Sequence, residues 1–207
     1  MLATVACALP AAASPAAEVD LPTLLSTADG FVKAEKNLYF TAAQSLYRWK
    51  EDESASLIAQ GIGGQLVGDT DALYALDFSR RTLTRLPLSQ AAPAVPAEVY
   101  PLDSPALLDA AGAPRLLRGY AASGGWLFLL VESDLPLKTD LLTLRLSDGR
   151  WQMMERQNIQ AIAACGNGTV LMASYDIRDE MSGCEILRYN AESGEKALFA
   201  ALPSPRP

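Results

Sequence analysis

The chain has 207 residues and half of them are apolar, which is enough for one large or two small domains with a substantial core. Its formal net charge of −7 argues against nucleic acid and anionic membrane surfaces as partners. The chain contains no histidine, which excludes Ser/His/Asp and Cys/His catalysis and the usual zinc sites. Carboxylates, Lys, Tyr and Cys remain as reactive groups.

Residues 1–20 are apolar and rich in Ala, and they resemble the distal part of an export signal. Small residues at Ala11 and Ala13 suit signal peptidase, and Thr4–Cys7 is similar to a weak lipobox, so lipid anchoring stays open. The usual basic n-region is missing, since the first Lys or Arg is Lys33. We expect an export leader whose start is lost or misassigned; the alternative is a disordered Ala/Pro-rich leader. No other stretch is apolar over a length that spans a membrane.

The next segment, Glu18–Ser26, contains apolar Val19, Leu21, Leu24 and Leu25. Pro22 cannot donate to a strand ladder, so we predict an edge strand or a coil for these residues.

A strand–turn–strand unit then occurs four times. In the most complete copy, Cys184–Phe199, the polar turn Glu192-Ser193-Gly194 separates two strand-like segments. A hairpin of this kind buries one face and is marginal alone, so repeated copies must stack into a common core. The copies align without gaps, always with apolar first and fourth positions and a polar fifth, at Leu46–Ser54, Leu73–Arg81, Leu141–Gly149 and Ile186–Gly194.

Further strand signals precede each hairpin. Ile159–Ala164 and Thr169–Tyr175 flank Asn167-Gly168, the pair that favours a two-residue hairpin turn. Trp126–Val131 and Leu38–Thr41 are the corresponding predicted strands before the upstream hairpins. We therefore predict an all-β fold, a β-propeller-like stack of about four antiparallel four-stranded meanders. The predicted blades are residues 27–60, 61–89, 115–156 and 157–202.

The segment Ala72–Leu86, with Leu73, Tyr74, Leu76 and Asp77 in its first strand, resembles the repeats of bacterial β-propeller proteins of the quinoprotein-like and WD40-like style. The resemblance implies a propeller fold and a fragment of such a protein, but many functions share this repeat. Arg81 stands where these repeats usually have glycine, and no Trp follows Leu86. No cofactor residues are therefore carried over, and no cofactor is expected.

The hairpins are unevenly spaced. Blade 61–89 has too few residues for four strands, so we expect it to be degenerate, lacking a strand or borrowing Gln60–Gly64. A Pro/Ala-rich insertion, residues 90–114, suits an extended surface loop with a short helical turn at Pro105–Ala110.

The C-terminal residues 203–207 read as a Pro-rich tail or linker. Four blades are few for a closed propeller, which leaves two alternatives. The chain is an incomplete ring with a further domain after Pro207, or it is a self-contained four-bladed ring, in which Glu18–Ser26 would complete the last blade.

Loops that join the second and third strands of each blade meet at one end of a propeller. In this chain they are acidic, and they predict a rim that binds a hard cation, a cationic ligand or a hydroxyl-rich ligand. Solvated loop carboxylates are the simpler interpretation. The candidate rim residues are Asp69, Asp71, Glu132, Asp134, Asp140, Asp176, Asp179 and Glu180. No metal site is predicted, because none of these runs has the spacing of a calcium loop.

Cys165 and Cys184 are predicted to be free. Cys165 ends one strand and Cys184 opens the next strand but one, which places them about 20 Å apart at ~3.3 Å per residue. A disulfide needs Cα atoms within about 7 Å. We expect Cys165 to be a small buried core residue. The Trp and Tyr residues are expected to pack in the core rather than to stack on sugars.

Two functional hypotheses remain. The first is a non-catalytic binding or scaffold module, secreted or attached to the surface of a bacterium, with an unidentified ligand or protein partner at the rim. It could form the N-terminal part of a larger solute-binding or surface protein. The second is a fragment of a propeller enzyme, either a quinoprotein-like oxidoreductase or a glycan-acting enzyme. The absence of histidine favours the first.

Overall fold

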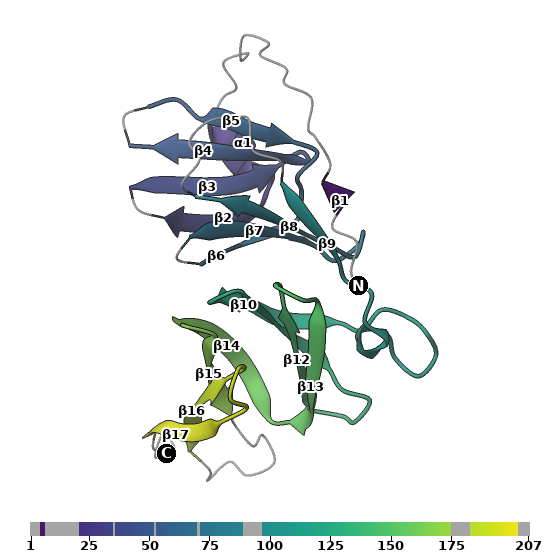
Figure 1. Ribbon diagram of the computed structural model, residues 1–207. Coiled ribbons are helices and arrows are strands. Elements are labelled where there is room, and N and C mark those ends of the chain that lie inside the picture. The colour runs from purple at the N-terminus through teal and green to yellow at the C-terminus, as the bar shows by residue number, and fades with distance from the viewer. Residues whose placement is uncertain are drawn as a thin grey trace. The chain divides into compact units, whose positions relative to one another are not determined.

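The computed structural model describes residues 5–6, 21–34, 36–51, 53–69, 71–88, 97–174 and 183–202 (Figure 1). The chain divides into two compact units, Leu2–Leu102 and Asp103–Pro207. Both units are built from antiparallel β-sheets.

The described residues of the first unit form one short helix and two sheets. The helix is α1 (Leu21–Ser26). Blade 1 comprises β2 (Ala28–Ala34), β3 (Asn37–Ala42), β4 (Ser45–Lys50) and β5 (Ser56–Gln60). Blade 2 comprises β6 (Gln65–Gly68), β7 (Ala72–Asp77), β8 (Thr82–Pro87) and β9 (Glu98–Pro101), with β1 (Val5–Ala6) added to β9.

The second unit begins with the 3₁₀ turn η1 (Pro105–Leu107), which confirms the helical turn expected at this point. Blade 3 comprises β10 (Leu117–Ser123), β11 (Trp126–Glu132), β12 (Thr139–Arg145) and β13 (Arg150–Gln157). Blade 4 comprises β14 (Ile159–Gly166), β15 (Thr169–Ser174), β16 (Cys184–Asn190) and β17 (Lys196–Leu202).

Each blade is an antiparallel meander whose four main strands follow chain order, so the fold is all-β and of the β-propeller class. The predicted hairpins are the third and fourth strands of blades 1, 3 and 4, but in blade 2 the hairpin is formed by the second and third strands, β7 and β8. The predicted turn at Asn167-Gly168 is confirmed, since it joins β14 to β15 with Asn167 at φ 50° and Gly168 at φ 68°.

The expectation that blade 2 is degenerate is wrong. Its fourth strand, β9, lies inside the Pro/Ala-rich insertion that the sequence predicts as loop, so the blade extends beyond residue 89. The pairing is fixed by side chains: Arg85 on β8 lies directly opposite Glu98 on β9, and their charged groups are 3.2 Å apart. The Tyr100 hydroxyl also donates to Glu98, at 2.8 Å. These contacts hold a short strand that its own composition does not identify.

The strand or coil predicted for Glu18–Ser26 is also wrong where the structure describes it, because Leu21–Ser26 is helical. Pro22 lies in the first turn, where a helix needs no backbone N–H donor, so proline is tolerated there. Leu24 is buried and packs with Phe40 and Ala42 of blade 1. No helix in the described ranges is long and apolar enough to cross a membrane.

Neighbouring blades within each unit share a core. Leu46, Leu66 and Ala75 belong to one cluster of the first unit, and β2 approaches β6 so closely that a Cβ on Gly30 would lie 2.5 Å from the Leu66 nitrogen. In the second unit the shared cluster of blades 3 and 4 includes Trp126, Phe128, Leu130, Leu141, Val170, Met172 and Tyr189. This confirms that the repeated hairpins stack, and it places the aromatic Trp126 and Tyr189 in the core.

Both described cysteines, Cys165 and Cys184, are free, as predicted. The expectation that Cys165 is buried is wrong, because its side chain is exposed. The register of β14 against β15 shifts between Ala164 and Gly166, so Cys165 is the unpaired residue of a bulge. A bulge redirects the side chain, and strict alternation no longer predicts its face.

Candidate functional site

The predicted acidic rim falls in three places. Asp69 and Asp71 lie in the β6–β7 turn of the first unit, whereas Glu132, Asp134 and Asp140 lie in and beside the β11–β12 connection of the second. Asp176, Asp179 and Glu180 lie outside the described residues. The structure therefore brings together the three carboxylates of blade 3.

Arg115 compensates two of those three carboxylates. Its guanidinium forms an ion pair with Asp140, and the two side chains are only 11% and 5% exposed. Asp140 accepts a second hydrogen bond from the Arg156 backbone N–H at 2.7 Å. Asp134 is exposed and lies 3.5 Å from the same guanidinium. Asp140 is thus a buried structural residue rather than an open ligand.

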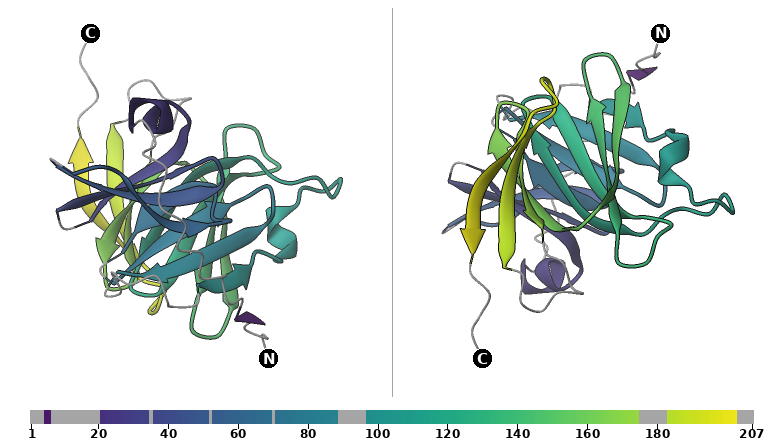
Figure 2. Two further views of the ribbon diagram at one scale, coloured as in Figure 1. Left: turned by 90° about the horizontal axis from the view of Figure 1, so that it is seen from above. Right: turned by 90° about the horizontal axis from the view of Figure 1, so that it is seen from below.

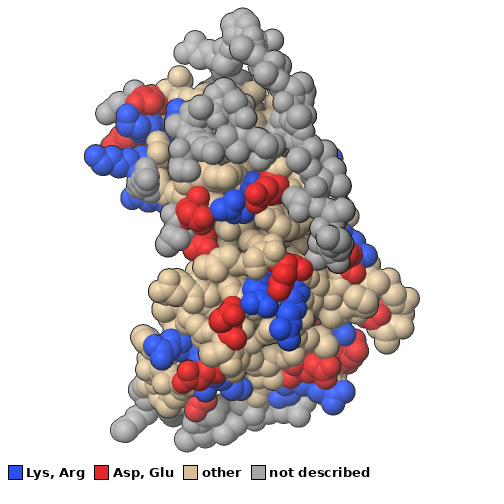
Figure 3. All heavy atoms as spheres, viewed as in Figure 1, with Lys and Arg blue, Asp and Glu red and all other residues tan. Residues whose placement is uncertain are grey.

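Glu132 has its own arginine, because Arg118 on β10 forms an ion pair with it across the strand pair. On blade 2 the guanidinium of Arg85 lies 2.9 Å from Asp71. In Figure 3, acidic and basic side chains likewise lie next to one another in small groups. Each of four predicted rim carboxylates therefore has an arginine partner within the protein: Asp71, Glu132, Asp134 and Asp140.

Tyr100 completes the charged group of blade 2. Burial and the adjacent carboxylate of Glu98 raise the pKa of Tyr100 to about 12. The phenol therefore stays protonated and donates its hydrogen bond to Glu98. Among the described residues, no group of three or more Cys, Asp or Glu side chains is arranged to hold a metal ion.

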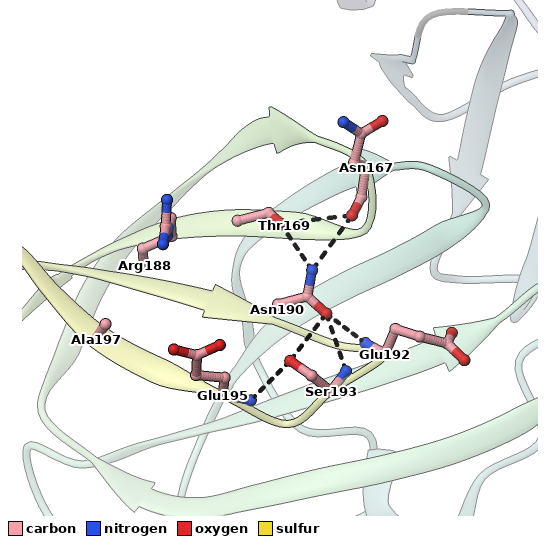
Figure 4. A pocket seen from close by; sticks show the side chains of 8 residues that line it. All are labelled: Asn167, Thr169, Arg188, Asn190, Glu192, Ser193, Glu195 and Ala197. Atoms are coloured by element: carbon pink, nitrogen blue, oxygen red, sulfur yellow. Dashed lines mark hydrogen bonds between the residues drawn. The ribbon is translucent and has the colours of Figure 1, made fainter.

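A pocket of about 580 Å³ lies on blade 4, at the end of the sheet where the β14–β15 and β16–β17 turns meet (Figure 4). This volume is in the range of small-molecule sites. The pocket is lined by Asn167, Thr169, Arg188, Asn190, Glu192, Ser193, Glu195 and Ala197. Sequence reasoning identified none of these as a ligand site, although it singled out both turns.

Asn190 holds the two turns together. Its amide nitrogen donates to the Thr169 hydroxyl at 3.1 Å and to the Asn167 carbonyl at 3.4 Å. Its side-chain oxygen accepts from the backbone N–H groups of Glu192 and Ser193, both at 3.0 Å. One side chain thus bonds both hairpin turns and links several residues that line the pocket.

Two charged side chains of the pocket have no polar partner among the described residues. They are Arg188, exposed in the middle of β16, and Glu195, exposed immediately before β17. The side-chain amide of Asn167 likewise makes no hydrogen bond within the described ranges. Figure 4 shows Arg188 and Asn167 extending to the same side of the sheet, with the Glu195 carboxylate turned toward Ala197. A guanidinium, an amide and a carboxylate are therefore available to a ligand.

Glu192 differs from Glu195 because a neighbouring blade compensates it. Arg145 of β12 lies 3.3 Å from the Glu192 carboxylate and 3.0 Å from Asp148. The same guanidinium carbon lies 5.4 Å from the centroid of the Trp126 ring. The contact fastens the β16–β17 turn to blade 3, and it leaves Arg188 and Glu195 as the uncompensated charges of the pocket.

No protein-family model and no curated protein matches this chain. Similar solved structures include the tricorn protease (TM-score 0.55, 11% identity, 85% of this chain and 17% of that chain). Apo AztD from Citrobacter koseri is another (TM-score 0.50, 9% identity, covering 85% of this chain and 46% of that chain). A third is the hydrazine synthase of Kuenenia stuttgartiensis (TM-score 0.49, 9% identity, covering 92% of this chain and 53% of that chain).

At these identities the first two likenesses show the β-propeller fold alone. The chain spans less than two thirds of the length of each of these proteins. The first of these proteins is a protease, and the fold alone does not decide between an enzyme and a binding protein.

Proposed function

We propose that this chain is a non-catalytic binding module that takes a small polar ligand in the pocket of blade 4. The observation that carries the proposal is the arrangement of Arg188 and Glu195, two opposite charges without a polar partner among the described residues, beside the hydrogen bonds of Asn190 that link the two turns. Preorganised polar groups on a rigid sheet reduce the entropy lost when a ligand binds.

The charges of the pocket select the class of ligand. A simple anion would pair with Arg188 but be repelled by Glu195. A simple cation would pair with Glu195 but be repelled by Arg188. A ligand that carries both charges, such as a zwitterionic amino acid, satisfies both groups and leaves neither unpaired. None of the described residues that line the pocket is aromatic, so they offer no stacking surface of the kind that sugars favour.

The proposed module works outside the cytoplasm, as a secreted or surface-attached part of a larger bacterial binding protein. The support is the Ala-rich leader of residues 1–20, with Ala11 and Ala13 suiting signal peptidase. Mass spectrometry of protein recovered from its native host tests this. Cleavage next to either Ala, or a lipidated Cys7, supports export, whereas an intact N-terminus in the cytoplasm contradicts it.

Calorimetric titration with alanine, acetate and methylammonium tests the ligand class. We expect alanine to bind and the two singly charged probes to bind at least about tenfold more weakly, because each leaves one pocket charge unpaired. Arg188→Gln should abolish the preference for alanine over methylammonium, and Glu195→Gln should abolish the preference for alanine over acetate. Arg150→Gln, which removes an exposed arginine of blade 3, is the matched control and should change nothing.

Binding that is unaffected by both pocket variants would contradict the proposed site. Equal binding of acetate and alanine would contradict the ligand class. Turnover of any probe by the wild-type protein would contradict the non-catalytic role.

A further inference from the structure

The last strand of the described chain, β17, is the outer margin of blade 4. It pairs with β16 on one side, and within the described ranges no strand pairs with its other side. Both views of Figure 2 show β17, in yellow, at the margin of its sheet. A free edge of this kind presents unpaired backbone donors and acceptors.

The side chains of β17 do not protect that edge. Leu198, Phe199 and Leu202 are 60%, 61% and 52% exposed. Natural edge strands usually carry charges or proline that prevent pairing with another chain. The outer strand of blade 3, β13, follows this rule with Arg150, Glu155 and Arg156, whereas Lys196 is the only charged residue of β17. Blade 4 therefore has an exposed apolar edge.

In the chain before any leader is removed, the outer edge of another blade accepts an added strand. In blade 2, Val5–Ala6 pairs antiparallel with Glu98 and Val99 of β9, on the side away from β8. The equivalent position of blade 4 is the free side of β17.

We propose that β17 is a dimerisation edge, on which β17 of a second copy of this chain adds in the antiparallel direction. Two four-stranded blades then form one continuous sheet around a twofold axis. The charges and the faces of the strand argue for a second copy.

Cross-strand partners show which residues share a face. Tyr189 and Glu185 are four residues apart on β16 and point the same way, so their partners on β17, Lys196 and Ala201, also share a face. A bulge at Phe199 absorbs the odd spacing. Lys196 of one copy can therefore lie opposite Ala201 of the other with both side chains on one face.

In that register the charges are complementary. Glu185 of β16 lies opposite Ala201 of β17. Lys196 of the second copy would lie opposite Ala201 on its other side, so it is two strand spacings, about 10 Å, from Glu185 on the same face of the sheet. The side chain between them is only a methyl group, and Glu185 is exposed without an ion-pair partner among the described residues. The long side chains of Lys and Glu span this distance. The twofold axis makes the contact twice.

The same register places Leu198 of each copy opposite Phe199 of the other. The centre of the interface is then apolar and its two ends are ion-paired. The two Lys196 residues lie at opposite ends, so like charges do not meet.

Sedimentation and light scattering of the full chain over a concentration series test the proposal. We expect a dimer that dissociates on dilution, and Phe199→Lys should abolish it because two ammonium groups enter the apolar centre. Met153→Lys, at a 43% exposed residue of β13, is the matched control and should remain dimeric. A wild-type chain that is monomeric at every concentration overturns the proposal, as does a dimer that Phe199→Lys leaves intact.

A charge exchange tests the register even if Phe199→Lys does not fold. Lys196→Glu and Glu185→Lys should each weaken dimerisation roughly tenfold, since both symmetric ion pairs are lost. The double variant Lys196→Glu/Glu185→Lys should recover the wild-type dissociation constant. A double variant as weak as the single ones overturns the proposed pairing.

Discussion

Arg115 and Asp140 form a buried ion pair that joins the segment before blade 3 to the blade itself. The Arg115 guanidinium also donates to the carbonyl oxygens of Leu108 and Glu132, at 2.9 and 3.3 Å. One arginine thus ties the η1 region to β11 and β12. A predicted rim carboxylate is in this way part of the framework of the blade.

Replacing either partner should destabilise the protein strongly. Asp140→Ala or Arg115→Ala leaves a buried charge without its partner, and we expect a loss of about 3–5 kcal/mol in the free energy of unfolding. Urea unfolding measures it. Asp134→Asn is the control, because Asp134 is 59% exposed and its replacement should cost less than about 0.5 kcal/mol. Equal effects at Asp134 and Asp140 would contradict the structural role.

Leu144→Asp should abolish folding, because Leu144 is 2% exposed and the change buries an unpaired charge. Its pairing with Leu127 and Trp151 places it in the middle of blade 3. Circular dichroism and the yield of soluble protein provide the measurement. Met153→Asp, at a 43% exposed residue of β13, should fold normally. A soluble Leu144→Asp protein that melts cooperatively would show that the register is wrong.

Two glycines allow a matched test of close packing between blades 3 and 4. Gly124 and Gly112 both have positive φ, but only at Gly124 would an added Cβ clash, at 2.3 Å from the Gly168 nitrogen. Gly112→Ala should therefore cost about 1 kcal/mol of backbone strain. Gly124→Ala should cost about 1–3 kcal/mol more, since the β10–β11 turn must move away from the β14–β15 turn. Thermal unfolding of both variants checks this, and equal melting temperatures would contradict the contact.

Asp77 should make folding stability depend on pH. Burial alone would raise its pKa, but hydrogen bonds from the Ser79 hydroxyl and the Arg80 backbone N–H outweigh this and hold the pKa of Asp77 below its usual value. A lowered pKa means that the carboxylate stabilises the fold above its unfolded pKa of about 3.9, and that this stabilisation is lost as pH falls through the folded pKa. The Asp77→Asn protein should therefore be less stable than the wild-type protein at neutral pH. Its free energy of unfolding should fall less than that of the wild-type protein when the pH is lowered. Denaturant unfolding at several pH values measures this; parallel profiles for the two proteins would contradict it.

The sequence predicted what depends on local pattern. Alternating apolar residues and polar turns identified the four hairpins, and Asn167-Gly168 identified its turn, because strand and turn preferences act over a few neighbouring residues. The sequence-based prediction was wrong where the structure depends on contacts between residues far apart in the chain. β9 carries no strong strand signal of its own and is held by Arg85, and a bulge turns Cys165 outward.

The candidate site was the least predictable part, and the rim carboxylates show the reason. The sequence identifies Asp140 as a loop carboxylate, but its partner Arg115 lies 25 residues away and meets it only after blade 3 has formed. The pocket likewise requires Asn190 to reach Asn167, which is 23 residues distant. The all-β, repeated-meander fold was therefore determined by the sequence alone, through local periodicity. Which charges are paired, and which remain free to bind, was decided only by the tertiary structure, because sheet pairing brings together side chains that the chain keeps apart.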